Sequence, residues 1–71
     1  MQVMEEDESW YKVEGMDNVL ELHWVVEGGK IEKRDGKDCV KVKFYDDAPC
    51  HSVTACGKYV NGVEFREKIE K

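Results

Sequence analysis

The sequence lacks any long apolar run, and its 71 residues include one proline and three cysteines. No segment approaches the roughly 18 consecutive apolar residues that a membrane-spanning helix needs. The first ten residues, MQVMEEDESW, have neither the cationic region nor the apolar region of a secretion signal. We therefore expect a cytoplasmic protein that has no membrane partner and whose cysteines stay reduced.

Catalytic signatures are also missing. The sequence has no glycine-rich phosphate loop, no serine elbow and no recognisable pair of catalytic carboxylates. Cys50 and His51 are adjacent, but neighbours in an extended segment point to opposite sides and rarely form a nucleophile with its base. The sequence therefore predicts a protein that is not an enzyme and needs no cofactor.

A chain of 71 residues has room for one domain. Such a chain buries only about 60% of the surface that its unfolded form exposes, so its stability is small. Apolar residues make up 41% of the sequence and charged residues 38%, which is typical of a globular protein. We expect a single domain over residues 9–71, preceded by an acidic tail over residues 1–8.

Charge is distributed unevenly along the chain. Residues 1–27 hold eight acids and one cation, Lys12, whereas the whole chain has a net charge of −5. An acidic run usually solvates a surface, and it can also meet a basic partner. The candidates for a protein interface are four of the first acids and four aromatic residues: Glu5, Glu6, Asp7, Glu8, Trp10, Tyr11, Tyr45 and Tyr59.

Three dipeptides mark tight turns: Gly28-Gly29, Asp35-Gly36 and Asn61-Gly62. Each accepts a positive φ at both positions, as a two-residue type I′ hairpin requires. Sequences typical of strands flank these turns, among them NVLELHWVVE before the first and CVKVKFY after the second. The dipeptides therefore predict hairpins.

The first two turns predict one shared apolar face, because side chains alternate along a strand and a tight turn fixes the register. A turn at Gly28-Gly29 pairs Val26 with Ile31. A turn at Asp35-Gly36 pairs Ile31 with Val40. Both registers place the same residues on the inner face: Leu20, Leu22, Trp24, Val26, Ile31, Val40, Val42 and Phe44.

Three further strands are predicted at residues 9–14, 52–60 and 63–67. Residues 64–71 are open between strand and helix, because Glu64 and Lys68 have the i, i+4 spacing of a helix. Five to six strands with one apolar face must curl to bury it. We predict an all-β antiparallel meander that forms an SH3-like or OB-like barrel, with a short helical turn as an option at the C-terminal end.

The cations of residues 27–44 suggest an alternative role in nucleic-acid binding, with Lys30, Arg34, Lys37, Lys41 and Lys43 as the candidate residues. Acids interleave with these cations, and the net charge of the chain opposes a polyanion. The predicted register places Trp24 and Phe44 on the core face, which leaves Tyr45 as the nearest aromatic for stacking. A solvated hairpin is the favoured interpretation.

A zinc-stabilised module is a second alternative, with Cys39, Cys50, His51 and Cys56 as ligands. Thiolates and imidazoles are the usual ligands of zinc, which stabilises small folds. The sequence has no C-x-x-C pair to hold two ligands on one turn, and the predicted register places Cys39 on the outer face. Free thiols and the absence of a metal are therefore favoured.

These features together predict a small, acidic, non-catalytic protein-interaction module. Stoichiometric inhibitors and adaptors, such as phage- or plasmid-encoded antagonists of host machinery, are typical of such chains. The expected partner is another protein or a second copy of the chain. It would bind through exposed aromatic residues, the acidic N-terminal region or an unpaired strand edge.

Overall fold

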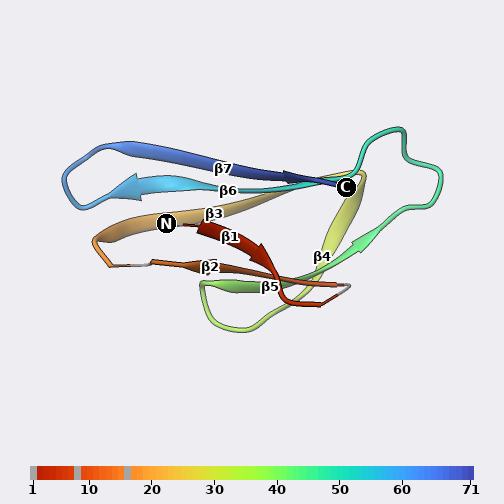
Figure 1. Cartoon of the computed structure of the whole chain (residues 1–71), viewed down its shortest axis with the longest axis horizontal. Helices are drawn as coiled ribbons and strands as arrows, with labels where there is room; N and C mark the ends of the chain where they lie inside the picture. The colour runs from red at the N-terminus through yellow and green to blue at the C-terminus, as the bar shows by residue number, and fades with distance from the viewer. Residues whose placement is uncertain (1, 8, 16) are drawn as a thin grey trace.

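The computed structural model describes residues 2–7, 9–15 and 17–71, and its regular structure is entirely β (Figure 1). Seven strands follow along the chain: β1 (Gln2–Glu5), β2 (Trp10–Glu14), β3 (Val19–Glu27), β4 (Gly29–Arg34), β5 (Cys39–Phe44), β6 (Ser52–Tyr59) and β7 (Glu64–Glu70). The helical turn considered for residues 64–71 is wrong, because the cross-strand pairing of β7 with β6 fixes this segment as a strand. Among the described residues, no helix is long and apolar enough to cross a bilayer.

The strands form two antiparallel sheets, one in the order β1-β2-β5-β4 and the other in the order β3-β6-β7. The two sheets face each other in an elongated molecule of 40 × 21 × 15 Å (Figure 1). The prediction of an all-β fold is confirmed. No closed barrel is found, since no ladder between described residues joins β3 to β4 or β1 to β7. The SH3-like or OB-like barrel therefore stays a prediction.

The hydrophobic core lies between the two sheets and consists of Tyr11, Val13, Trp24, Val40, Val42, Val53 and Ala55. Most of the predicted inner face is confirmed, because its members are either in this core or pack against it. Leu20 is the exception, with 60% of its surface exposed. A register shift between Val19 and Glu21 interrupts the alternation of β3 at this point.

The Gly28-Gly29 dipeptide does not close the predicted hairpin. β3 pairs with β6 and β4 pairs with β5, so the predicted pairing of Val26 with Ile31 is wrong. The chain passes from one sheet to the other at this corner, and only Gly28 of the two glycines has a positive φ, 73°. Val26 and Ile31 still pack against the same core because the two sheets face each other.

The hairpin predicted at Asp35-Gly36 forms between β4 and β5, but in a different register. Ile31 lies opposite Val42 instead of Val40. The backbone N–H of Asp35 donates to the carbonyl of Cys39 at 2.9 Å, so the loop is longer than the two residues predicted. Relative to the prediction, the partner of Ile31 is displaced by two residues, from Val40 to Val42. Because this displacement is an even number, Ile31, Val40 and Val42 still share the inner face.

The segment predicted as an acidic tail contributes a strand. β1 pairs with β2, with Val3 opposite Val13, and the side chain of Val3 packs against the core. Glu6 and Asp7 follow this strand and are exposed, which is compatible with a strand at the edge of a sheet. Glu8 lies outside the described residues.

Candidate functional site

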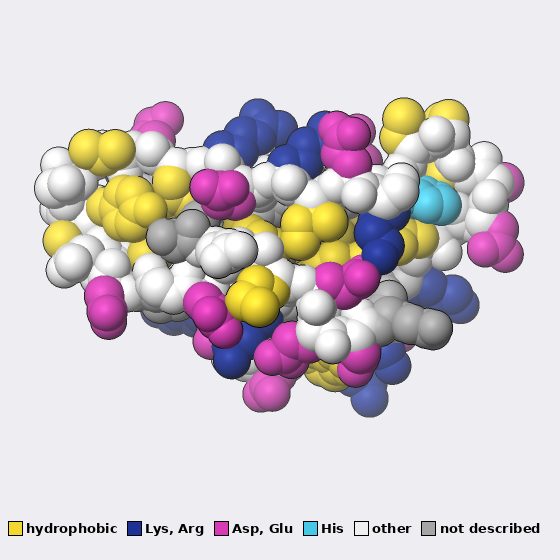
Figure 2. Space-filling model, in the orientation of Figure 1, with side chains coloured by type: hydrophobic (Ala, Val, Ile, Leu, Met, Phe, Trp, Pro, Cys, Tyr) yellow, Lys and Arg dark blue, Asp and Glu magenta, His cyan; other side chains and the backbone are white. Residues whose placement is uncertain are grey.

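One end of the molecule exposes apolar side chains (Figure 2, left). Leu20, Val60 and Val63 are exposed by 60%, 61% and 56%. They lie where the β6–β7 turn meets the start of β3, and the N–H of Val60 donates to the carbonyl of Asn18 at 2.7 Å. We refer to Leu20, Val60 and Val63 as the apolar end.

Two aromatic rings adjoin the apolar end. Tyr59 and Phe65 are both half-buried, and their ring centroids are 4.9 Å apart. Tyr59 is one of the interface candidates from the sequence, whereas Phe65 is not. Exposed apolar side chains that gather in one place mark protein-binding surfaces more often than scattered ones do.

Sequence analysis missed the three residues of the apolar end. Strand alternation assigned Leu20 to the core, and the register shift in β3 reverses this assignment. Val60 and Val63 flank the Asn61-Gly62 turn. In this chain both valines lie outside the core, and their position beside the turn was visible in the sequence.

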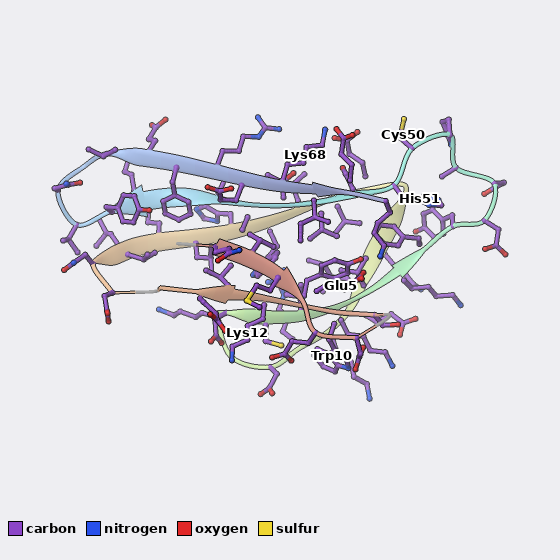
Figure 3. The ribbon with its side chains drawn as sticks, viewed as in Figure 1. Glu5, Trp10, Lys12, Cys50, His51 and Lys68 are labelled. Carbon is purple, nitrogen blue, oxygen red and sulfur yellow. The ribbon has the colours of Figure 1, made fainter. Side chains whose placement is uncertain are left out.

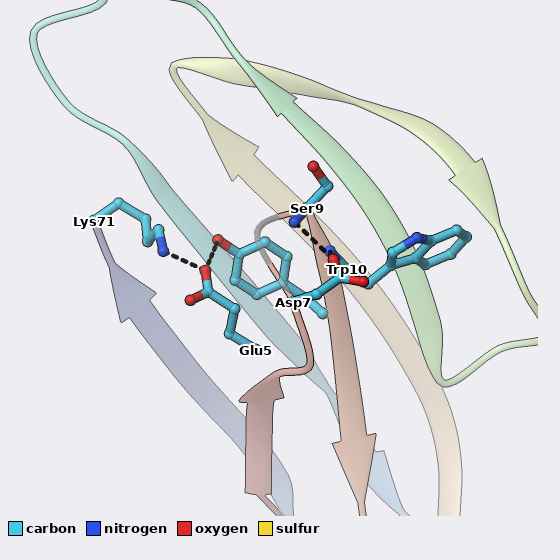
Figure 4. A network of polar contacts seen from close by, with 6 residues as sticks. Glu5, Asp7, Ser9, Trp10 and Lys71 are labelled. Carbon is cyan, nitrogen blue, oxygen red and sulfur yellow. Dashed lines mark hydrogen bonds and ion pairs between the residues drawn. The ribbon is translucent and has the colours of Figure 1, made fainter.

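Glu5 and Tyr11, two of the N-terminal candidates, are bound to each other within the fold (Figure 4). Tyr11 is fully buried, and its hydroxyl donates to Oε2 of Glu5 at 2.8 Å. Nζ of Lys71 donates to the same oxygen. The hydrogen bonds from Lys71 and Tyr11 hold the pKa of Glu5 below its usual range, and burial raises the pKa of Tyr11. Tyr11 is therefore not an exposed anchor.

The turn between β1 and β2 contains Glu6 and Asp7, and Trp10 is the first residue of β2. Oδ1 of Asp7 accepts hydrogen bonds from the N–H groups of Ser9 and Trp10, at 3.0 and 3.2 Å (Figure 4). The carboxylate of Glu6 lies 3.8 Å from Nζ of Lys12. The half-buried side chain of Trp10 projects from β2 away from the second sheet, as Lys12 does (Figure 3).

Tyr45 begins the loop between β5 and β6, and its surface is 47% exposed. Its carbonyl oxygen accepts a hydrogen bond of 2.6 Å from Nε2 of His51. The ring of His51 also stacks on Phe44, with the centroids 4.9 Å apart. These contacts tie the loop to the core, so His51 is occupied in holding the fold and Tyr45 is free to contact a partner.

The structure does not gather the candidate zinc ligands. Cys39 projects from the outer face of one sheet and Cys56 from the outer face of the other, whereas Cys50 is exposed in a loop. In residues 2–7, 9–15 and 17–71, no group of three or more His, Cys, Asp or Glu side chains is placed to hold a metal. Burial, together with the charge of nearby carboxylates, raises the pKa of the Cys39 thiol.

Three of the five nucleic-acid candidates share one surface. Val40 and Val42 face the core, so the alternating Lys41 and Lys43 face outward. Lys30 lies directly opposite Lys43 on the same face. The remaining two candidates, Arg34 and Lys37, are exposed at the end of the β4–β5 hairpin.

The same outer face carries two residues that sequence analysis did not assign to it. Lys33 lies opposite Lys41 on one side, and Trp10 lies opposite Lys41 on the other. Trp10 reaches this face because β2 pairs with β5. The aromatic side chain that sequence analysis did not find beside the lysines is therefore present.

Comparisons with protein-family models, with curated proteins and with solved structures find no match. Two surfaces of the described residues are candidates for binding: the apolar end, and the outer face that carries the lysines.

Proposed function

We propose that the protein is a small non-catalytic protein-interaction module that binds its partner at the apolar end. The observation that carries the proposal is the exposure of Leu20, Val60 and Val63, each of which leaves more than half of its surface in water. Removal of apolar surface from water contributes about 25 cal/mol per Å² before the entropic costs of association are subtracted. The fold leaves more than half of the surface of each of these residues available for such burial.

The backbone at the apolar end is held in place before any partner binds. The N–H of Val60 donates to the carbonyl of Asn18 at 2.7 Å, and the N–H of Val63 donates to Oδ1 of Asn61 at 3.0 Å. A preorganised surface loses less conformational entropy on binding than a flexible one. This rigidity favours a stable, stoichiometric complex, as expected of an inhibitor or an adaptor.

The finer fold assignment is part of the same proposal. The Gly28 corner joins the β3 edge to the β4 edge, and the contact of Glu5 with Lys71 brings β1 beside the end of β7. The edge strands of the two sheets are thus connected on both sides, β3 to β4 and β1 to β7. These connections support an arrangement close to an SH3-like or OB-like barrel. A barrel-like frame would hold the apolar end rigidly.

The test compares partner capture by three forms of the immobilised full chain: wild type, Val60→Ser/Val63→Ser, and Val25→Ser. Val25 is the matched control because it is 47% exposed and lies on the outer face of the β3-β6-β7 sheet. We expect wild type and Val25→Ser to retain the same partner from a lysate of the source organism. Val60→Ser/Val63→Ser should weaken the complex by about ten-fold or more.

Circular dichroism and urea unfolding show whether each variant is folded. Sedimentation of wild type over a range of concentrations tests a second copy as the partner, and the same substitutions should weaken that self-association. Equal retention of the partner by all three forms would overturn the proposal. So would the absence of both a captured partner and self-association.

A further inference from the structure

We propose that the outer face of the β1-β2-β5-β4 sheet binds single-stranded nucleic acid. Lysines on this face would contact phosphates, and Trp10 would stack on a base. We refer to Trp10, Lys30, Lys33, Lys41 and Lys43 as the lysine–tryptophan face. The inference goes beyond the proposed protein interaction, because it uses none of the residues of the apolar end.

The lysines of this face repel one another across β4 and β5. Lys30 lies opposite Lys43, and Lys33 lies opposite Lys41. Like charges directly opposite one another destabilise a sheet. Among the ion pairs of the described residues, these four lysines take part in one, between Lys41 and Glu32 at 4.0 Å. An arrangement that lowers stability and is poorly compensated within the chain favours an anionic ligand.

Protection against aggregation explains only part of this arrangement. Lysines on an edge strand hinder the addition of a foreign strand, and β4 is an edge strand. β5 is a central strand between β2 and β4, so Lys41 and Lys43 protect no edge. Their position near the middle of the sheet suits a ligand that lies across the face.

Trp10 makes a nucleic-acid strand a better ligand than a simple anion. It lies opposite Lys41, which lies opposite Lys33, so the three side chains form a row across three strands. Trp10 and Lys41 also line a shallow hollow with Asp7 and Ser9. Aromatic side chains on a sheet stack on unpaired bases while neighbouring cations follow the backbone. The carboxylates of an acidic protein segment would pair with the lysines, but they would not stack on the indole of Trp10.

Acids beside the face favour a single strand over a duplex. Glu32 lies beside Lys41, Glu6 beside Lys12, and Glu14 is exposed on the outer side of β2. They limit the net positive charge of this side of the molecule. A duplex presents two phosphate backbones and hides its bases, so it would meet these acids without reaching Trp10. A single strand can follow the lysines and present its bases.

The test measures the anisotropy of a labelled oligo-dT of about 15 nucleotides, with the full chain, at about 50 and 200 mM salt. If all four lysines contact phosphates, affinity should fall about 50-fold between these concentrations, from a slope of about 0.7 per phosphate. Lys41→Gln/Lys43→Gln should weaken binding by about ten-fold or more and lower the slope by about 1.4. Trp10→Leu should weaken binding at least about five-fold without changing the slope.

Lys58→Gln/Arg66→Gln is the matched control, because it removes two cations from the outer face of the other sheet. It should leave the affinity for oligo-dT within about two-fold of wild type. Lys41→Gln/Lys43→Gln should also unfold at higher urea than wild type, because it removes the like-charge pairs. Urea unfolding of all variants, Trp10→Leu included, confirms that each is folded.

Three results would overturn the inference. The first is that wild type binds neither oligo-dT nor oligo-rU at the lower salt concentration. The second is an equal loss of affinity in both double variants, which would mean that net charge alone drives binding. The third is that polyglutamate competes as well as oligo-dT for wild type and Trp10→Leu alike. That result would indicate an acidic protein as the ligand.

Discussion

The hydroxyl of Tyr11 donates a hydrogen bond of 2.8 Å to Oε2 of Glu5, and Nζ of Lys71 donates to the same oxygen. Glu5 and Lys71 are 66 positions apart, so this contact ties the first strand to the end of the chain. No ladder between described residues joins β1 to β7. Side chains therefore hold this seam of the molecule, where a closed barrel would have backbone hydrogen bonds.

Removal of the Tyr11 hydroxyl should weaken this seam. Tyr11→Phe keeps the buried ring and deletes the donor to Glu5. We expect the free energy of unfolding to fall by about 1 kcal/mol, which is less than for a buried bond to a charged group, because water partly screens Glu5. Urea unfolding at neutral pH measures the change. Tyr45→Phe is the control, since the surface of Tyr45 is 47% exposed, and a loss of equal size there would contradict the expectation.

Acid should destabilise the protein through Glu5. Hydrogen bonds from Lys71 and Tyr11 lower the pKa of Glu5 in the folded state. In the unfolded chain, a glutamate side chain has a pKa of about 4.3. The unfolded state therefore binds the proton first. The stability contributed by this carboxylate is present above about pH 4.3 and is lost as the pH falls through the lowered pKa of the folded state. The pKa of Lys71 is raised by its hydrogen bond with Glu5, so its charge does not change in this range.

The measurement is urea unfolding of wild type and Glu5→Gln between about pH 6 and pH 3. Glu5→Gln lacks the titrating group, so its stability should fall less steeply with acid than that of wild type. The difference between the two proteins should narrow as the pH decreases. If the free energies of unfolding of the two proteins changed in parallel with pH, the role assigned to Glu5 would be wrong.

The inner face was easier to predict from the sequence than the strand pairing. Alternation is a local property, and it correctly assigned Val40, Val42 and Trp24 to the core. Strand pairing, in contrast, depends on contacts between segments that are far apart in the sequence, such as β3 with β6. A Gly-Gly dipeptide has the same local sequence whether it closes a hairpin or turns a corner between two sheets. The pairing of β3 with β6, and the close approach of Gly28 to the Cys50 carbonyl, are not visible in the sequence.

The candidate surfaces were only partly predictable for the same reason. Lys30, Lys41 and Lys43 were among the candidates because residues 27–44 are rich in cations. Lys33 was missed because the register shift between Ile31 and Lys33 is not visible in the sequence. Trp10 was placed apart from them, because its position opposite Lys41 comes from the pairing of β2 with β5. Alternation alone also does not tell which of Trp10 and Tyr11 faces inward. A solvated hairpin was favoured because acids interleave with the cations, because the nearest aromatics face the core, and because the chain has a net negative charge. The pairing of β2 with β5 changes the second of these grounds by placing Trp10 beside Lys41.

Substitution of Gly28 should be far more damaging than substitution of Gly62. Both have a positive φ, 73° and 89°. A Cβ at position 28 would lie 1.9 Å from the carbonyl oxygen of Cys50, whereas one at position 62 would meet nothing within 4 Å. Gly62→Ala should cost about 1–2 kcal/mol of backbone strain. Gly28→Ala adds a clash with the backbone at the corner between the sheets.

Far-UV circular dichroism and urea unfolding of the two alanine variants measure this difference. We expect Gly28→Ala to lose more than about 3 kcal/mol, which would leave a chain of this size largely unfolded. Gly62→Ala should stay folded. Equal stability of the two variants would show that the backbone at the corner relaxes at little cost.

Substitution of Ser52 by alanine should raise the stability of the protein. Ser52 is 3% exposed, and its Oγ has no hydrogen-bond partner among the described residues. The residue lies on the central strand β6, between Glu27 of β3 and Glu70 of β7. Nζ of Lys68 lies 3.9 Å from Glu27 and 3.4 Å from Glu70, so the charged groups around Ser52 are paired with one another. A buried hydroxyl without a partner costs about 1–3 kcal/mol.

Ser52→Ala removes that hydroxyl and leaves a methyl group in its place. We expect the free energy of unfolding to rise by about 1 kcal/mol, measured by urea unfolding at neutral pH. Ser9→Ala is the control, because Ser9 is half-exposed in the turn before β2 and its replacement should change stability by less than about 0.5 kcal/mol. A loss of stability in Ser52→Ala would mean that the hydroxyl is hydrogen-bonded in solution, and the cost assigned to its burial would be wrong.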